Sequence, residues 1–109
     1  MSDNRVILVG NLGRDPETRY TQGGDAVCTF SIATSESWRD KSTGQRVEKT
    51  EWHNIVLYRK LAEIAQQYLT KGKMVYVEGR IQSRKYTGKD GLERTSFEII
   101  GDSMQMLGS

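Results

Sequence analysis

Apolar and polar residues alternate with a period of two in several segments of the chain, a pattern typical of β-strands with one buried face. The alternation runs through residues 5–10, 27–34 and 51–58, and it returns over 74–86 and 95–100. The first three segments have the usual length of a strand. The pattern therefore predicts three strands early in the chain and a longer pair near its end.

The period changes over residues 61–69, where apolar side chains recur at intervals of three and four. That spacing predicts one short amphipathic helix, and Lys71-Gly72 supplies its C-terminal stop. Beyond the helix, the Gly-containing loop 87–91 predicts an extended hairpin between the last two strands. Residues 104–108 are expected to form a short extra strand or an ordered tail.

Three strands, a helix and at least two more strands follow one another in the order of a small Greek-key barrel of the OB type. We predict an all-β fold with one short helix, a five-stranded OB-fold barrel with extended β-hairpins. The alternative is a fragment of a β-sandwich, but seven strands are hard to find here. The chain has 109 residues, of which 36% are hydrophobic, so residues 1–109 are expected to form a single domain around one core.

Cysteine and histidine usage argues against catalysis and against a metal site. The chain has one cysteine, Cys28, and one histidine, His53, so it offers neither an internal disulfide nor a zinc site built from Cys pairs. Its carboxylates form no recognisable catalytic pair. We expect a protein that is not an enzyme, uses no cofactor or metal, and buries Cys28 by packing.

Charge is placed unevenly although it nearly balances overall. Sixteen Lys and Arg against fourteen Asp and Glu leave a net charge of +2. Residues 71–89, however, contain six Lys or Arg and one acid, Glu78, which gives this segment a local charge of +5. A solvated edge hairpin protected by its charges would show the same pattern, so charge alone does not decide the function.

Aromatic residues interleave with the basic ones, which favours single-stranded nucleic acid as the ligand. Trp38, Tyr58 and Tyr86 each adjoin a basic residue, and Trp52 lies on the strand at 51–58. Bases stack on aromatic rings at about 1–3 kcal/mol each, while phosphates require a track of cations. Trp52 could equally be a core residue, whereas Trp38 lies in a polar stretch with few apolar neighbours.

Six segments together resemble the DNA-binding domain of the bacterial single-stranded DNA-binding protein family. They are VILVGNLGRDPETRY (6–20), FSIATSESWRD (30–40), TEWHNIVLY (50–58), LAEIAQQYLTKG (61–72), VYVEGRIQSRKY (75–86) and MQMLG (104–108). The resemblance covers nearly the whole chain, in order and with the spacing intact. It implies an OB-fold protomer of a homotetramer that binds and protects single-stranded DNA without sequence preference during replication, recombination and repair.

The resemblance also assigns roles to individual residues. The aromatic positions expected to stack on bases are Trp38, Trp52, Tyr58 and Tyr86. The last two depart from the best-known relatives, which have Phe and Trp there, and the smaller ring at Tyr86 puts the strength of that stack in doubt. Basic positions of the family's DNA path fall on Lys41, Lys60, Lys71 and Lys85. Charge and placement add Arg5, Arg19, Lys73, Arg80 and Arg84.

Three further residues are expected at contacts between protomers. From the residues alone, His53 is interpreted as a neutral, hydrogen-bonded side chain in a packed environment. The resemblance places His53 at the subunit interface, and Tyr76 and Glu78 resemble residues that pair protomers across extended sheets. In its longer form, the family also has a flexible linker and an acidic tip that recruits replication and repair proteins, but this chain stops at Ser109.

Several alternatives remain open from the sequence. One is an OB-fold primosome component or an RNA-binding protein, and another is an OB module that binds a protein or an oligosaccharide. No apolar stretch is long enough to cross a bilayer, and the N-terminus lacks a signal peptide. We therefore expect a cytoplasmic protein, and the resemblance implies that it is bacterial and associated with the nucleoid.

Overall fold

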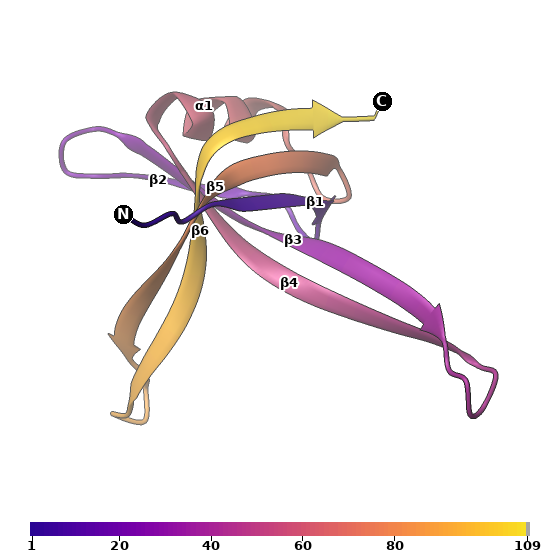
Figure 1. The fold of residues 1–109 in the computed structure, drawn as a ribbon. Coiled ribbons are helices and arrows are strands. Elements are labelled where there is room, and N and C mark those ends of the chain that lie inside the picture. Colours follow the sequence, from indigo (N-terminus) through magenta and orange to yellow (C-terminus); the bar gives the residue numbers. More distant parts are fainter. Residues whose placement is uncertain (109) are drawn as a thin grey trace.

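The computed structural model describes residues 1–108, which form six strands and one helix (Figure 1). The elements are β1 (Val6–Leu12), β2 (Glu17–Tyr20), β3 (Ala26–Arg39), β4 (Arg46–Tyr58), α1 (Arg59–Tyr68), β5 (Met74–Thr87) and β6 (Glu93–Leu107). The predicted helix and all five predicted strands are present.

Five of the strands close into a barrel. Neighbouring strands follow the order β1-β5-β6-β4-β3, and β3 pairs with β1 through Asn11↔Ala33 and Leu12↔Ile32, which completes the ring. The short parallel contact joins β4 to β6 at Ile55↔Ile99, while the other pairings are antiparallel. This closed arrangement confirms the predicted OB-type barrel with one helix and rules out the β-sandwich alternative.

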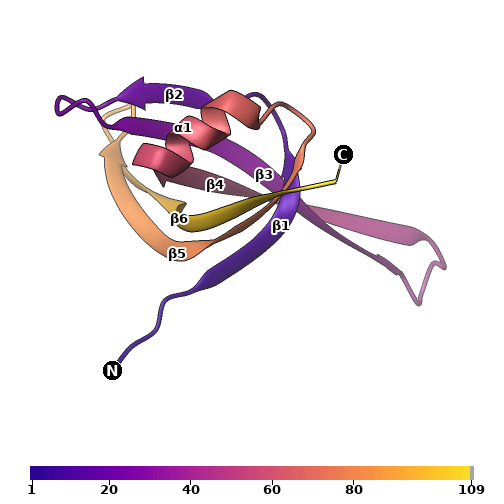
Figure 2. The same cartoon turned by 90° about the horizontal axis from the view of Figure 1, so that it is seen from above.

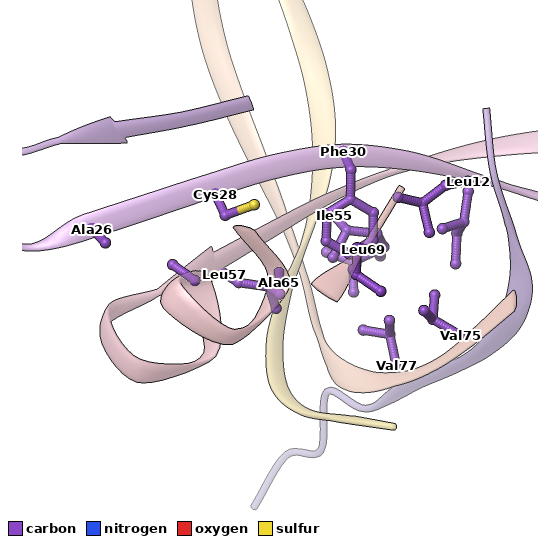
Figure 3. Packing of buried hydrophobic residues seen from close by; sticks show 13 residues of the cluster. Leu12, Ala26, Cys28, Phe30, Ile55, Leu57, Ala65, Leu69, Val75 and Val77 are labelled. Atoms are coloured by element: carbon purple, nitrogen blue, oxygen red, sulfur yellow. The ribbon is translucent and has the colours of Figure 1, made fainter. Parts of the chain in front are cut away.

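One core fills the barrel, and α1 covers it (Figures 2 and 3). The helix buries Ala62 and Ala65, the small residues of its apolar face, against side chains from the strands. Cys28 is fully buried there as a free thiol, and burial raises its pKa. The prediction that Cys28 is a packing residue is confirmed.

The strands differ from the sequence prediction mainly where the chain leaves the barrel. The predicted strand at residues 27–34 continues to Arg39, and its partner β4 already starts at Arg46. Both faces of this extension meet solvent, so no apolar alternation marks it in the sequence. β2 was missed for the same reason, since its four residues ETRY contain no apolar row. Residues 104–107 are the end of β6, not a separate strand.

Two hairpins project from the barrel as arms (Figure 1). We call the outer parts of β3 and β4, residues 34–51, the β3–β4 arm, and those of β5 and β6, residues 81–98, the β5–β6 arm. On the β5–β6 arm, Ile81 continues the alternating row of Val75, Val77 and Gly79 on β5, but its side chain is 45% exposed. Ile81 pairs with Ile99, which still belongs to the core, so Ile81 lies at the margin of the barrel.

The junction between β4 and α1 has no intervening loop. Tyr58 ends the strand, and Arg59 starts the helix with a φ of 57°. Within residues 1–108, Arg59 is the residue other than glycine with a positive φ. The left-handed region costs such a residue about 1–3 kcal/mol, which glycine would avoid.

Candidate nucleic-acid interface

Side chains that point away from the core along β3 and β4 form the centre of an outer face. The register pairs Trp52 with Ala33 and Asn54 with Ser31. Directly paired residues project to the same side of a sheet, and the alternate positions, such as Ile55, belong to the core. We use the term outer face for Trp52, Asn54, Val56, Tyr58 and the residues beside them on the neighbouring strands.

The outer face extends over both neighbouring regions of the barrel. Val56 packs with Val27 of β3 and Ile100 of β6 in a small buried cluster outside the main core. On the other side, the row Arg19, Val27 and Tyr58 crosses β2, β3 and β4. The arrangement places Arg19, a predicted cation, on the same face as a predicted stacking residue.

A groove of about 370 Å³ lies on this face where β3, β4, β5 and β6 meet. Its walls include Asn54, Arg84, Tyr86 and Glu98, together with Arg14 from the turn after β1. Arg84 and Tyr86 share one face of β5, since both are at even positions. The groove thus brings together side chains that are far apart in the sequence.

Three of the four predicted stacking residues present exposed rings on or beside the outer face. Trp52 is 58% exposed, Tyr58 is 42% exposed and Tyr86 is 45% exposed. A core position for Trp52 is therefore ruled out. Its indole lies over Gly13, where a Cβ would come within 2.5 Å of a ring carbon. Gly13 has no side chain, and this leaves room for the ring.

The fourth aromatic residue, Trp38, lies apart from the others. It pairs with Val47 on the β3–β4 arm, and its position alternates with that of Ala33, the partner of Trp52. Trp38 is therefore on the opposite face of the ribbon, about 17 Å along β3 from Ala33 at the usual rise of a strand. With Arg39 and Arg46 it lines a smaller hollow near the end of the arm.

The predicted cations divide into those with and without a carboxylate partner. Ion pairs join Arg5 to Glu78, Arg80 to Asp102 and Lys85 to Glu93. Within the described residues, no ion pair forms at Arg19, Lys41, Lys60, Lys71, Lys73 or Arg84. Arg19 and Arg84 lie on the outer face, whereas Lys71 and Lys73 lie in the connection from α1 to β5, beside the end of β1.

Arg5 belongs to a different surface, on the outward side of β1 and β5. There the Tyr76 hydroxyl donates a 2.8 Å hydrogen bond to Glu78, and Arg5 donates one of 3.0 Å to the other carboxylate oxygen. The hydrogen bond from Tyr76, with a further one from Arg5, lowers the pKa of Glu78, and the same bond raises the pKa of Tyr76. Two exposed apolar residues, Ile7 and Val9, are the β1 partners of Glu78 and Tyr76.

His53 lies close to this second surface. Its Nε2 is 2.8 Å from the Thr34 hydroxyl, which agrees with the interpretation of a hydrogen-bonded side chain, although the contact is only partly buried. His53 also lines a groove of about 570 Å³ together with Ile7 and Val9. The three residues predicted at contacts between protomers therefore gather around β1, away from the groove that contains Tyr86.

Comparison with known proteins identifies the family of this chain. A model of the single-strand binding protein family matches residues 3–107. The chain belongs to this family. Single-stranded DNA-binding proteins from Neisseria meningitidis serogroups A and B are each 68% identical to it over 108 residues. The match takes in 99% of this chain and 62% of each relative, so the chain spans about three fifths of their length.

A solved structure supports the same assignment. The Plasmodium falciparum SSB complex with ssDNA superposes with a TM-score of 0.90 at 36% sequence identity, covering 99% of this chain and 97% of that chain. Both the predicted family and the predicted OB fold are confirmed. Within residues 1–108, no cluster of three or more His, Cys, Asp or Glu has metal-binding geometry, and no helix is long and apolar enough to cross a membrane.

The sequence pattern did not single out two exposed residues, Phe97 and Arg14. Phe97 is 60% exposed on β6, opposite Ser83. Phe97 alternates with Ile99, a core residue, but the β5–β6 arm has left the barrel at that point. Arg14 in the groove had no signal, because an isolated cation in a turn is indistinguishable from ordinary surface charge.

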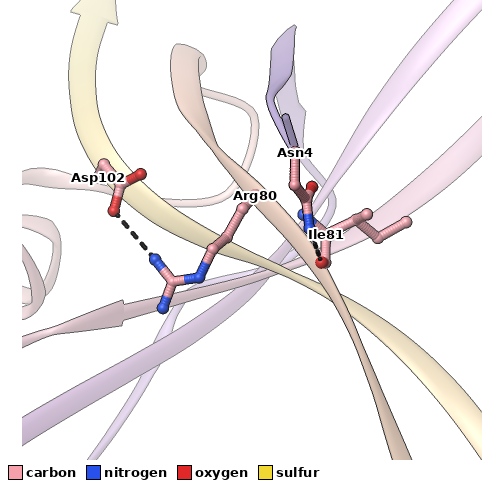
Figure 4. Close-up of polar contacts among 4 residues, drawn as sticks. All are labelled: Asn4, Arg80, Ile81 and Asp102. Carbon is pink, nitrogen blue, oxygen red and sulfur yellow. Dashed lines mark hydrogen bonds and ion pairs between the residues drawn. The ribbon is translucent and has the colours of Figure 1, made fainter. Parts of the chain in front are cut away.

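The root of the β5–β6 arm is fixed by side chains (Figure 4). The Asn4 amide donates to the carbonyl of Ile81 at 2.9 Å and accepts from its N–H at 3.0 Å, which continues the β1–β5 ladder beyond Val6. Beside it, Arg80 is 3.4 Å from Asp102 across β5 and β6, next to the bulge at Glu78/Gly79. These contacts hold the strand that carries Arg84 and Tyr86.

Proposed function

We propose that this chain binds single-stranded DNA without sequence preference and without catalysing a reaction. The carrying observation is the outer face, on which Trp52, Tyr58 and Tyr86 present exposed rings beside the cations Arg19 and Arg84. Every base has a flat face that can stack on such rings, and every nucleotide brings a phosphate for the cations. Stacking does not depend on base identity, so the ligand is a single strand of any sequence.

The proposed path starts in the groove at Tyr86, crosses the outer face at Trp52 and Tyr58, and reaches the β3–β4 arm. Trp38 and Lys41 are proposed as contacts of the arm, which the strand meets after leaving the barrel. Lys60 follows Tyr58 closely, while Lys71 and Lys73 extend the path past the end of β1. Arg5, Arg80 and Lys85 already have carboxylate partners, and we propose weaker contributions from them.

A fluorescence titration of the two tryptophans with oligo-dT, repeated over a salt series, tests this function. Stacking should quench the emission of Trp52, and release of counterions should make binding weaker as salt rises. An affinity unaffected by salt would overturn the proposal and point to a sugar- or protein-binding OB module. Competition with an RNA oligomer of the same sequence tests the preference for DNA, and equal competition would overturn that preference.

We also propose a homotetramer, supported by two separate surfaces around β1. One is an open edge, because β1 pairs on one side with β5 from Val6 to Asn11 but meets β3 only at Asn11 and Leu12. The other is the sheet face with Ile7, Val9 and Tyr76. Two self-complementary surfaces are what a closed tetramer of two-fold symmetry needs.

Light scattering over a range of concentrations tests this assembly. A tetramer mass is expected, and a stable 12.4 kDa monomer at micromolar concentration would overturn the proposal. Action in bacterial replication, recombination and repair, in the cytoplasm with nucleoid DNA, is part of the same proposal and is supported by the family. Recruitment of replication and repair proteins stays a prediction of the family resemblance.

A further inference from the structure

Arg59 occupies a strained position next to a proposed stacking residue. Its φ of 57° lies in the left-handed region, where the Cβ of an arginine is crowded and glycine is not. The turn from β4 directly into α1 demands this conformation, because Tyr58 is still extended and the helix begins at the next residue. The geometry of the turn explains the backbone, but it does not explain an arginine there.

Within the chain, Arg59 forms an exposed ion pair with Asp25, which does not offset the cost of its left-handed backbone. Its Nε is 3.6 Å from the Asp25 carboxylate, and the two side chains are 74% and 50% exposed. An ion pair so open to water contributes little to stability, less than the left-handed conformation costs. An anion supplied by a ligand would therefore stabilise the Arg59 side chain more than Asp25 does.

The surroundings indicate which anion that is. Arg59 follows Tyr58, and Tyr58 shares the row across β2, β3 and β4 with Arg19. Asp25 belongs to the turn between β2 and β3, where its N–H donates to the Thr21 hydroxyl and its carbonyl accepts from the Thr21 N–H. A nucleotide stacked on Tyr58 would bring its phosphate close to Arg59, and a guanidinium can bind two phosphate oxygens at once.

We propose that Arg59 binds a phosphate of the single strand, that its left-handed backbone holds the guanidinium beside the Tyr58 stack, and that Asp25 is the internal partner displaced on binding. This inference rests on the proposed function. It gives a role to a cation that the sequence showed only as the basic neighbour of Tyr58 and that the resemblance did not assign. It also gives Asp25 a role as a competitor that weakens binding to the DNA.

The decisive variant is Arg59→Gly, which removes the charge and the strain together. Relief of strain should raise the melting temperature by about 2–6 °C, so any loss of binding is not a loss of folding. The slope of log K against log salt for oligo-dT should become shallower by about 0.7, the value for one lost phosphate contact on a single strand. Arg59→Lys should keep most of the wild-type slope.

Two further variants test the part assigned to Asp25. Asp25→Asn frees Arg59 and should bind oligo-dT at least twofold more tightly at low salt than Glu63→Gln, a matched loss of one exposed acid on α1. Equal affinities of the two variants would overturn the role of Asp25. An unchanged salt slope in Arg59→Gly would overturn the proposal. If glycine instead lowers the melting temperature, the neutral Arg59→Asn replaces it, and an unchanged salt slope in that variant would overturn the proposal. Failure of the wild type to bind oligo-dT would instead overturn the proposed function itself.

Discussion

The two tryptophans of this chain occupy contrasting regions, one on the barrel and one on an arm. Trp52 lies on a strand whose other face is packed into the core, and its ring lies over Gly13. Trp38 lies on a two-stranded ribbon with solvent on both faces, held by polar contacts such as Ser35 to Thr50 and Arg46 to Ser37. We expect the ring on the barrel to be held in place before a ligand binds, and the ring on the ribbon to be ordered by binding.

The first prediction breaks the better-placed stack. Trp52→Ala should weaken binding of oligo-dT by about 1–3 kcal/mol, and Trp38→Ala should cost less because part of the energy of that stack is spent in ordering the arm. Both affinities are measured by a titration that follows a fluorescent label on the DNA, since one tryptophan is lost in each variant. An equal or larger loss for Trp38→Ala would contradict the comparison.

The second prediction keeps Trp52 but changes Gly13, the residue beneath its ring. A methyl group at Gly13 would come within 2.5 Å of the indole, so Gly13→Ala should tilt the ring and cost about 1 kcal/mol of binding. The φ of Gly13 is not positive, so alanine fits the backbone. In a double-mutant cycle, Gly13→Ala should have no further effect once Trp52 is alanine.

Gly23→Ala is the matched control for this variant. The nearest atom to a Cβ at Gly23 is the Thr21 hydroxyl at 3.9 Å, and its φ is not positive either. The control should bind like the wild type. A loss of binding by Gly13→Ala that persists in the Trp52→Ala background would show that Gly13 acts on something other than the indole.

The third prediction concerns the other arm, where a side chain from outside the ribbon fixes the root. Asn4→Ala removes both hydrogen bonds to Ile81 and should loosen the strand that carries Tyr86. We expect binding to weaken about twofold to fivefold, the cost of about 0.5–1 kcal/mol in hydrogen bonding. The loss should vanish in a Tyr86→Ala background, and Ser2→Ala, in the same exposed segment, should have no effect.

The sequence predicted the barrel better than the arms, for a physical reason. Where one face of a strand packs against the core, as at Phe30 and Ile55, apolar residues alternate and the strand can be recognised. On the arms both faces meet water, so alternation either disappears, as before Trp38, or misleads, as at Ile81 and Phe97. Periodicity reports contact with a core, not pairing between strands.

The residues of the candidate site divide into those that the sequence indicated and those whose parts only the structure shows. Aromatic residues interleaved with cations, together with the family resemblance, pointed to Trp52, Tyr58 and Tyr86, and the structure presents all three rings to solvent. The sequence offered no signal for Gly13 and presented Arg59 only as the basic neighbour of Tyr58, because their parts depend on a ring over a backbone and on a backbone angle. Such relations join residues distant in the sequence or depend on conformation, and neither leaves a local pattern.

The last prediction has the smallest effect and concerns Glu78, on the outward side of β1 and β5. Hydrogen bonds from Tyr76 and Arg5 lower the pKa of Glu78 below its usual value of 4.5, so the folded state favours the charged carboxylate. A group with a lowered folded pKa stabilises the protein above its unfolded pKa, and that contribution is lost as pH falls through the folded pKa. The wild type should therefore melt at a slightly higher temperature than Glu78→Gln near neutral pH, and the difference should shrink as pH falls below about 4.5. Melting curves at one protein concentration measure this, with Glu48→Gln on the β3–β4 arm as the control, and a gap that stays constant down to low pH would show that Glu78 acts through packing rather than charge.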